Sequence, residues 1–221
     1  GLVLAIGGCD ANEAVAPEAA PASATAPKSA APTVPNSRGG VELVGSEAKP
    51  LAADLQWLDT EPLKLEELRG KVVLVRFWTD TCPFCEASAP GLTRLHERYG
   101  AEGLVVLGLF HPKPRGSIRD MKAVEARARE LGMTFPIASD TRWDTLERWW
   151  LSSGPGEREA TSVSFLLDAQ GIIRWVHPGP EFHPGGPPDA EHDLCRRDYD
   201  DAVRAIEALL AERGEASKKV G

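Results

Sequence analysis

The chain has 221 residues, of which 42% are hydrophobic and 26% are charged. This length and composition fit one globular domain of ordinary size with some chain left over, large enough to form a core without disulfides. The formal net charge of −8 argues against a nucleic-acid partner, because such a surface needs basic residues to neutralise phosphates. The four cysteines are too few for a disulfide framework: Cys82 and Cys85 form a close pair, whereas Cys9 and Cys195 stand alone.

The first nine residues form an apolar run that ends in two glycines and Cys9. Such an ending is typical of a secretory signal peptide, here expected to be truncated at its start. Residues 6–9 also resemble the lipobox of bacterial lipoproteins, which implies acylation of the Cys9 sulfur and a membrane anchor. The alternative is an ordinary signal-peptide tail with an incidental cysteine. The run is far shorter than the roughly 20 residues that a membrane-spanning helix needs.

Residues 10–48 are rich in Ala and Pro and are predicted to be a disordered tether. Its prolines favour extended conformations, so it would hold a folded domain away from a membrane surface. We expect that domain over residues 49–214, followed by a disordered tail at 215–221. The protein is therefore expected on the extracytoplasmic (periplasmic) side of a bacterial membrane, as a monomer.

The domain opens with a strand–helix–strand pattern. Residues 65–71 predict a short helical turn that ends at a glycine, and the β-branched and aromatic run at 72–78 predicts a buried strand. A helix is expected from 83 to 99, closed by Gly100, and a second apolar strand at 104–110. Strands joined in this way are expected to be parallel neighbours.

The second half of the domain predicts further helices and an antiparallel hairpin. Ser117 is expected to cap a helix that runs to Leu131. The remaining expected elements are an edge strand at 135–138, a helix at 140–151, strands at 163–167 and 172–176 joined by a turn, and a last helix at 197–213. Together they predict an α/β fold with a central mixed sheet flanked by helices.

Cys82 and Cys85 fall between a buried strand and the first turn of a helix. Free amide groups and the helix dipole stabilise an anion there and favour a thiolate. Two cysteines at this spacing can close a disulfide and reopen it through a mixed disulfide, and Pro83 suits the first helical position. A structural zinc site would need a second pair of ligands at similar spacing, which the sequence lacks. The motif therefore predicts redox chemistry, without a cofactor.

The residues around this motif resemble the thioredoxin-like superfamily. The run Phe77-Trp78-Thr79-Asp80-Thr81-Cys82-Pro83-Phe84-Cys85, with Pro90 beyond it, is similar to the family's FWA-x-W-C-x-x-C…P signature. The run Phe165-Leu166-Leu167-Asp168, with Gly171, resembles the hairpin of the TlpA/ResA and AhpC/TSA (redoxin) branches. The resemblance implies a thioredoxin-like fold, with Cys82 as nucleophile and Cys85 as resolving thiol. Many such proteins are tethered outside the cytoplasm.

Three positions depart from the family pattern. Ser162, preceded by Thr161, stands where the family has a cis-proline, and a cis peptide at a serine costs roughly 2.5–4 kcal/mol. Arg76 stands where some thioredoxins carry a buried acid; it is expected to point to the solvated side or to pair with a carboxylate, the alternative being that its guanidinium reaches the site and favours the thiolate. Thr81 replaces a tryptophan. These changes predict a specialised partner or oxidant instead of broad thioredoxin activity.

Two histidines and one cysteine remain to be interpreted. His111 and His177 each follow a strand that ends at the edge carrying Cys82, so they are candidates for a proton donor or, with both cysteines, for a transient metal site. The simpler interpretation is that both are loop histidines followed by proline. Cys195 is expected to pack the last helix, the alternative being an additional redox thiol.

The sequence thus predicts a thiol–disulfide oxidoreductase of the cell envelope that acts on protein cysteines and is recharged by a redox donor. Besides the two cysteines, the expected active-site rim comprises Thr79, Thr81, Pro83, Phe84, Thr161, Ser162, His111 and His177. One alternative is a thiol peroxidase: Thr79 matches the threonine of the peroxiredoxin motif, although Val75 replaces its proline. The other is a metal-binding or metal-delivery module that uses the cysteine pair.

Overall fold

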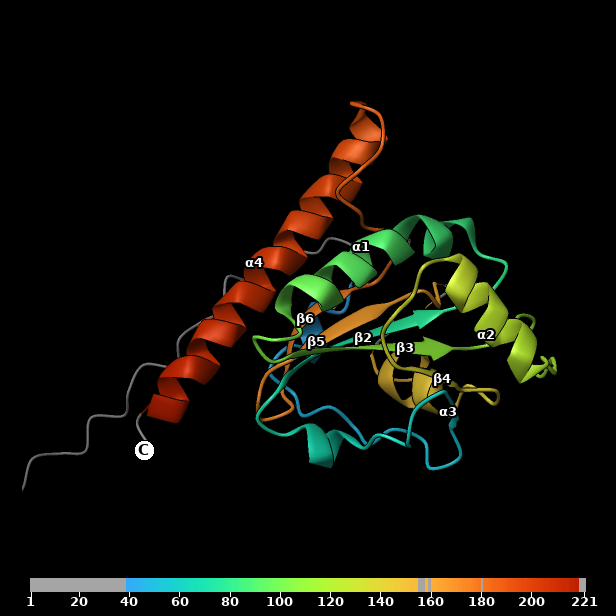
Figure 1. Ribbon diagram of the computed structural model, residues 1–221, viewed down its shortest axis with the longest axis horizontal. Helices are drawn as coiled ribbons and strands as arrows, with labels where there is room; N and C mark the ends of the chain where they lie inside the picture. The colour runs from blue at the N-terminus through green and yellow to red at the C-terminus, as the bar shows by residue number, and fades with distance from the viewer. Residues whose placement is uncertain (1–38, 155–157, 159, 180, 219–221) are drawn as a thin grey trace, which may run out of the picture. The chain divides into compact units, whose positions relative to one another are not determined.

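The computed structural model describes residues 39–154, 158, 160–179 and 181–218. The expected lipobox with Cys9, and the expected tether as far as residue 38, lie outside this part of the chain. The described residues build a sheet of six strands in the order β1-β4-β3-β2-β5-β6 (Figure 1). None of the helices in these ranges is both long and apolar enough to cross a membrane.

The centre of the sheet is the strand β2 (Val72–Trp78), all of whose side chains are buried. It pairs in parallel with β3 (Leu104–Phe110) and antiparallel with β5 (Ser164–Leu167). The strand β6 (Ile173–His177) completes the antiparallel hairpin with β5. The predicted mixed sheet, with a parallel centre and an antiparallel end, is confirmed.

The other half of the sheet differs from the prediction. The strand β4 (Ile137–Ser139) lies parallel to β3, but it is not the edge strand that residues 135–138 were predicted to form. The edge is β1 (Gln56–Leu58), which pairs antiparallel with β4. Sequence reasoning missed β1 because three residues are too short to show an alternating pattern.

Three helices cover one face of the sheet: α1 (Pro83–Tyr99), α2 (Met121–Glu130) and α4 (Ala190–Lys218), as Figure 1 shows. They bury apolar side chains against the even-numbered residues of β2. The opposite face is covered by short helical turns and their aromatic side chains. These turns are η1 (Val41–Leu43), η2 (Leu65–Leu68), α3 (Asp144–Leu146) and the π-helical η3 (Glu147–Leu151).

The folded part extends beyond the predicted residues 49–214 at both ends. Residues 39–48 were expected to belong to the tether, but Leu43 is buried and the Gly45 amide donates a hydrogen bond of 2.8 Å to the Ile173 carbonyl. The helix α4 begins before the predicted residue 197 and continues to Lys218. A helix packed along a domain can extend past its last apolar residue, because each added residue forms one more backbone hydrogen bond.

The helices of the middle segment begin later than predicted. Asp120, not Ser117, caps α2, and its side chain accepts a hydrogen bond from the Lys122 amide. The segment 140–151 becomes helical only at α3. There the buried Asp140 carboxylate accepts hydrogen bonds from the amides of Thr145 and Leu146. In both cases an aspartate binds the free amides of a first turn and so sets where the helix starts.

Candidate active site

The cysteine pair lies at the junction of β2 and α1. Cys82 has extended backbone angles and caps the helix, and Pro83 occupies the first turn, where its missing N–H costs nothing. The Cys85 amide donates a hydrogen bond of 3.0 Å to the Cys82 carbonyl. Both cysteines are free thiols; Cys82 is partly exposed and Cys85 is buried. Only the first is therefore open to a partner from solution.

The two sulfurs have opposite acidities. The hydrogen bond from Cys85, joined by the amides of Cys85 and Phe84 and the hydroxyl of Ser162, lowers the pKa of Cys82 to about 5 although burial opposes the shift. The same bond to Cys82, together with burial, raises the pKa of Cys85 above its ordinary range. At neutral pH the accessible sulfur is a thiolate and the buried sulfur is a thiol. Such a pair can act as a nucleophile and a resolving thiol.

Ser162 lies directly against both sulfurs. It stands in the loop just before β5, and its Oγ is 3.0 Å from Cys85 Sγ and 3.7 Å from Cys82 Sγ. Lys113–Pro114 is the one cis peptide in the described part of the chain, so the bond before Ser162 is trans. A hydroxyl group therefore faces the thiols at the position where the thioredoxin-like family carries its cis-proline.

The side chain of Arg76, on β2, lies close enough to the cysteine pair to act on Cys85. It is buried on the same face of β2 as the helices, and its Nη1 donates a hydrogen bond of 3.2 Å to Ser164 Oγ. Its guanidinium lies 5.7 Å from the ring centre of Phe182. The positive charge favours the thiolate of Cys85, and Glu181 is within electrostatic range. The expectation that Arg76 points to the solvated side is wrong, because α1 and α4 cover this face.

His111 is buried behind the loop that carries Ser162. Its Nε2 lies 2.9 Å from Thr161 Oγ1, and its ring packs edge-on against Trp143 at 5.0 Å. Burial, and then the charges of Lys113 and Arg76, lower the pKa of His111 to about 3. The imidazole is neutral at physiological pH and is not a proton donor of the imidazolium type there. It supports the loop through Thr161.

His177 does not turn toward the cysteines. Its Nε2 lies 2.9 Å from Asp198 Oδ2 on α4, and its ring stacks on Trp175. The sequence had suggested a transient metal site formed by Cys82, Cys85, His111 and His177. In the described residues these four side chains do not come together at ligand distance, because each histidine is bound to a different partner.

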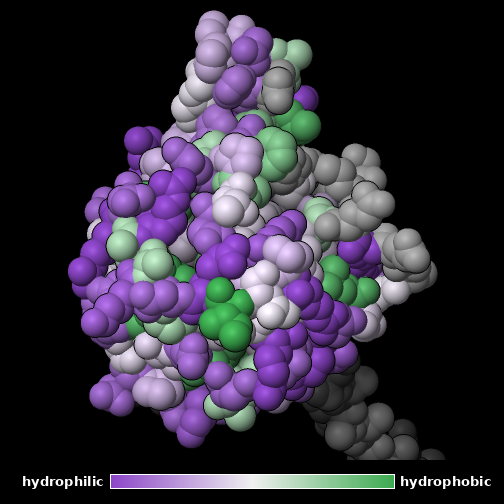
Figure 2. All heavy atoms as spheres, turned by 90° about the vertical axis from the view of Figure 1, so that its right-hand side faces the viewer, coloured by the Kyte–Doolittle hydropathy of each residue, from purple (hydrophilic) through white to green (hydrophobic). Residues whose placement is uncertain are grey.

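The rest of the predicted rim combines polar and apolar side chains. Thr79 is buried and donates a hydrogen bond to Asp80, which forms an ion pair of 3.0 Å with Arg119. Thr81, Pro83 and Phe84 are exposed, Phe84 by 42%. Figure 2 looks at the side of the molecule where β2 and β3 end in Figure 1, and its surface is largely hydrophilic with small separate apolar spots. Beside Cys82 itself, a partner would meet the exposed side chains of Thr81, Pro83 and Phe84.

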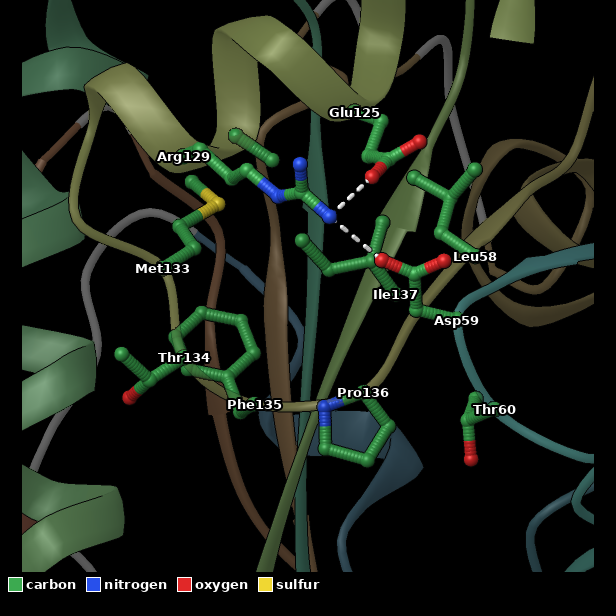
Figure 3. A pocket seen from close by; sticks show the side chains of 11 residues that line it. Leu58, Asp59, Thr60, Glu125, Arg129, Met133, Thr134, Phe135, Pro136 and Ile137 are labelled. Carbon is green, nitrogen blue, oxygen red and sulfur yellow. Dashed lines mark hydrogen bonds and ion pairs between the residues drawn. The ribbon is translucent and has the colours of Figure 1, made fainter. Parts of the chain in front are cut away.

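One hollow of about 320 Å³ lies between β1, β4 and α2 (Figure 3). Arg129 extends across it and forms ion pairs with Asp59, at 2.6 Å, and with Glu125. Apolar groups such as Met133 and Phe135 line its base, and no cysteine or histidine does. The hollow is thus separate from the cysteine pair at the start of α1.

The structure brings together three further side chains that sequence reasoning did not connect. Cys195, on α4, lies with its Sγ 3.4 Å from Glu181 Oε1, and His183 Nε2 lies 3.9 Å from the same oxygen. Burial and the neighbouring Glu181 raise the pKa of Cys195 to about 11, so it is no reactive thiolate. The only signal in the sequence was closeness along the chain, since Glu181 and Cys195 lie 14 positions apart.

The family model described as AhpC/TSA matches residues 44–176, which include both cysteines of the pair and the whole sheet except His177, the last residue of β6. The chain belongs to the AhpC/TSA family. Its thioredoxin-like fold is also seen in a thiol:disulfide interchange protein of the thioredoxin family from Chlorobium tepidum. That structure is 20% identical, covers 75% of this chain and 99% of its own, and has a TM-score of 0.51.

Two relatives carry informative names. Protein DipZ from Mycobacterium bovis is 32% identical over 128 residues, which are 54% of this chain and 16% of DipZ. The thiol-disulfide oxidoreductase ResA from Halalkalibacterium halodurans is 26% identical over 125 residues, 57% of this chain and 64% of ResA. The chain thus spans less than two thirds of the length of either relative.

Proposed function

We propose that the protein is a thiol–disulfide oxidoreductase that acts on cysteines of other proteins. The observation that carries this proposal is the asymmetry of the cysteine pair. Cys82 is accessible and has a pKa of about 5, whereas Cys85 is buried and has a raised pKa. An accessible thiolate attacks a disulfide, and a neighbouring protonated thiol waits to resolve the product. The name of the relative ResA supports the same activity.

The reaction begins when the Cys82 thiolate attacks one sulfur of a substrate disulfide. A mixed disulfide forms, the substrate S–S bond breaks, and the released thiolate takes up a proton. Cys85 then gives up its proton, helped by the positive charge of Arg76, and attacks the Cys82 sulfur. The Cys82–Cys85 disulfide forms and the second substrate thiol leaves. Two electrons pass from the enzyme to the substrate, and an external dithiol donor restores the enzyme.

This domain is proposed to act outside the cytoplasm as a monomer, held to a membrane by a lipid on Cys9. The lipobox-like residues 6–9 and the Ala/Pro-rich segment after them support this placement. The test is the membrane fraction of cells that express the full chain from its natural start. Loss of the protein from that fraction in a Cys9→Ser variant supports the anchor, and unchanged partition contradicts it.

The activity is tested by the reduction of insulin disulfides with a dithiol donor. We expect turnover by the wild type, none by Cys82→Ser, and a stable mixed disulfide with a substrate peptide in Cys85→Ser. The matched control is Ser153→Ala, which removes a hydroxyl bound to the Trp150 carbonyl, leaves both sulfurs in place and is expected to retain turnover. Failure of the wild type to reduce any protein or peptide disulfide, together with no trapped adduct in Cys85→Ser, would contradict the proposal.

A second candidate function is a thiol peroxidase, favoured by the AhpC/TSA family and by the Ser162 hydroxyl beside the thiols. In that reaction the Cys82 thiolate attacks the peroxide O–O bond, becomes a sulfenic acid and releases water or an alcohol. Cys85 then closes the disulfide and releases water. Stopped-flow oxidation of the reduced enzyme by peroxide, compared with oxidation by a peptide disulfide, distinguishes the two. We expect the disulfide to react faster.

A further inference from the structure

Cys195, Glu181 and His183 place three different metal-binding atoms around one point. Every pair of these ligand atoms lies within 4.8 Å, with Cys195 Sγ 3.4 Å and His183 Nε2 3.9 Å from Glu181 Oε1. Metal–ligand bonds of about 2.0–2.3 Å in a tetrahedral zinc site put neighbouring ligand atoms roughly 3.3–3.8 Å apart. The observed spacing is therefore close to that of a metal site, before any ion draws the side chains together.

The local backbone explains why the side chains of Glu181 and His183 converge. Phe182, between them, is fully buried, and its amide donates a hydrogen bond of 3.3 Å to Ser88 Oγ on α1. Glu181 and His183 flank this buried residue, and their side chains meet at Glu181 Oε1, 3.9 Å from His183 Nε2. The His183 amide also donates a hydrogen bond of 3.4 Å to the Cys195 carbonyl, which joins this loop to α4.

The donor set selects the kind of ion. A thiolate, an imidazole and a carboxylate suit zinc and similar divalent transition metals, whereas magnesium and calcium prefer oxygen ligands alone. Cys195 and His183 are buried, which limits competition from water. We propose that Glu181, His183 and Cys195 bind one zinc-class divalent metal ion, with a fourth position open to solvent.

The site is separate from the redox pair, since it uses neither Cys82 nor Cys85. A metal ion held there would fasten the loop at residues 181–183 to α4. It would also neutralise Glu181, whose charge is within electrostatic range of Arg76. The proposal does not depend on the oxidoreductase activity, and each can fail without the other.

The experiment uses the full chain with Cys9→Ser, Cys82→Ser and Cys85→Ser, so that Cys195 is the only thiol left. Titration with cobalt(II) under reducing conditions is expected to give one bound ion. A thiolate-to-cobalt charge-transfer band and the visible bands of tetrahedral cobalt should appear, and zinc should remove both. His183→Ala and Glu181→Gln, added to this background, should each weaken cobalt binding about tenfold or more. The matched control His96→Ala, on α1, should leave it unchanged.

Cys195→Ser in the same background should abolish the charge-transfer band. The circular dichroism of each variant is recorded, and the melting temperature of the parent should rise with zinc but stay constant with magnesium. The proposal is overturned if the folded parent shows no charge-transfer band. It is equally overturned if His183→Ala and Glu181→Gln, both folded, bind cobalt as tightly as the parent.

Discussion

The hydroxyl of Ser162 lies 3.0 Å from the sulfur of Cys85 and links the loop before β5 to the buried half of the redox pair. The same oxygen is 3.7 Å from Cys82. One side chain thus stabilises negative charge on whichever sulfur is ionised. A proline at this position would offer neither a donor nor an acceptor from its side chain. The position therefore influences the acidity of the thiols directly.

Ser162→Ala is expected to raise the pKa of Cys82 by about one unit, because a hydrogen bond to a charged group is lost. The reduced form then loses stability relative to the disulfide, and the redox potential becomes more negative by about 30 mV. The measurements are thiolate absorbance against pH and equilibration with glutathione. Ser153→Ala, which removes a hydroxyl bound to the nearby Trp150 carbonyl, is the control. An unchanged pKa in Ser162→Ala would contradict the role of this hydroxyl.

The alkylation rate of reduced protein by iodoacetamide should follow the ionisation of Cys82. We expect a plateau above about pH 6 and a fall as the pH drops through about 5. The pKa of Cys82 is depressed in the folded state, so its stabilisation of the reduced protein is complete above its ordinary value of 9.0 and is lost as the pH falls toward 5. Mass spectrometry should locate the label on Cys82. Labelling of Cys85 first would reverse the assignment.

Arg76→Met should slow the resolving step about tenfold, because the Cys85 thiolate loses the nearby positive charge. A methionine keeps much of the buried volume, and Arg76→Lys keeps the charge and should restore part of the rate. The measurement is the lifetime of the mixed disulfide with a peptide substrate in rapid-quench experiments. If both variants resolve the adduct equally slowly, the defect is structural and the charge has no role.

His111→Phe should reduce the loss of unfolding free energy that the protein suffers as the pH falls. The folded state depresses the pKa of His111 from 6.5 to about 3, so its contribution to stability is complete above pH 6.5 and is lost as the pH falls toward 3. In that window the wild type should lose about 1.4 kcal/mol of unfolding free energy per pH unit from this group. Urea unfolding between pH 7 and pH 4 measures the slope. Parallel slopes for wild type and variant would show that His111 titrates normally.

The local pattern of the sequence was sufficient for the central strands and for the position of the cysteines. The run at 72–78, the helix beginning at Pro83 and the run at 104–110 are each long enough to show their period, and their order requires a parallel pair. The turn around Gly171 likewise predicted the hairpin. The three-residue β1 and the aspartates that accept hydrogen bonds from the first-turn amides of α2 and α3 were missed, because short elements are defined by a partner strand or by a single side chain.

The sequence by itself determined an α/β domain with a cysteine pair at a helix start, because both follow from local periodicity and capping, and the resemblance of its motifs implied the thioredoxin-like fold. Only the tertiary structure decided what surrounds that pair. Arg76 is the one charged residue of β2, and both faces of this strand are otherwise apolar. The sequence therefore shows no alternation that would indicate which face Arg76 takes. The directions of His111 and His177, and the meeting of Glu181 with Cys195, depend on packing between distant segments. The opposite acidities of Cys82 and Cys85 arise from these contacts, since burial and hydrogen bonds act through space and not along the chain.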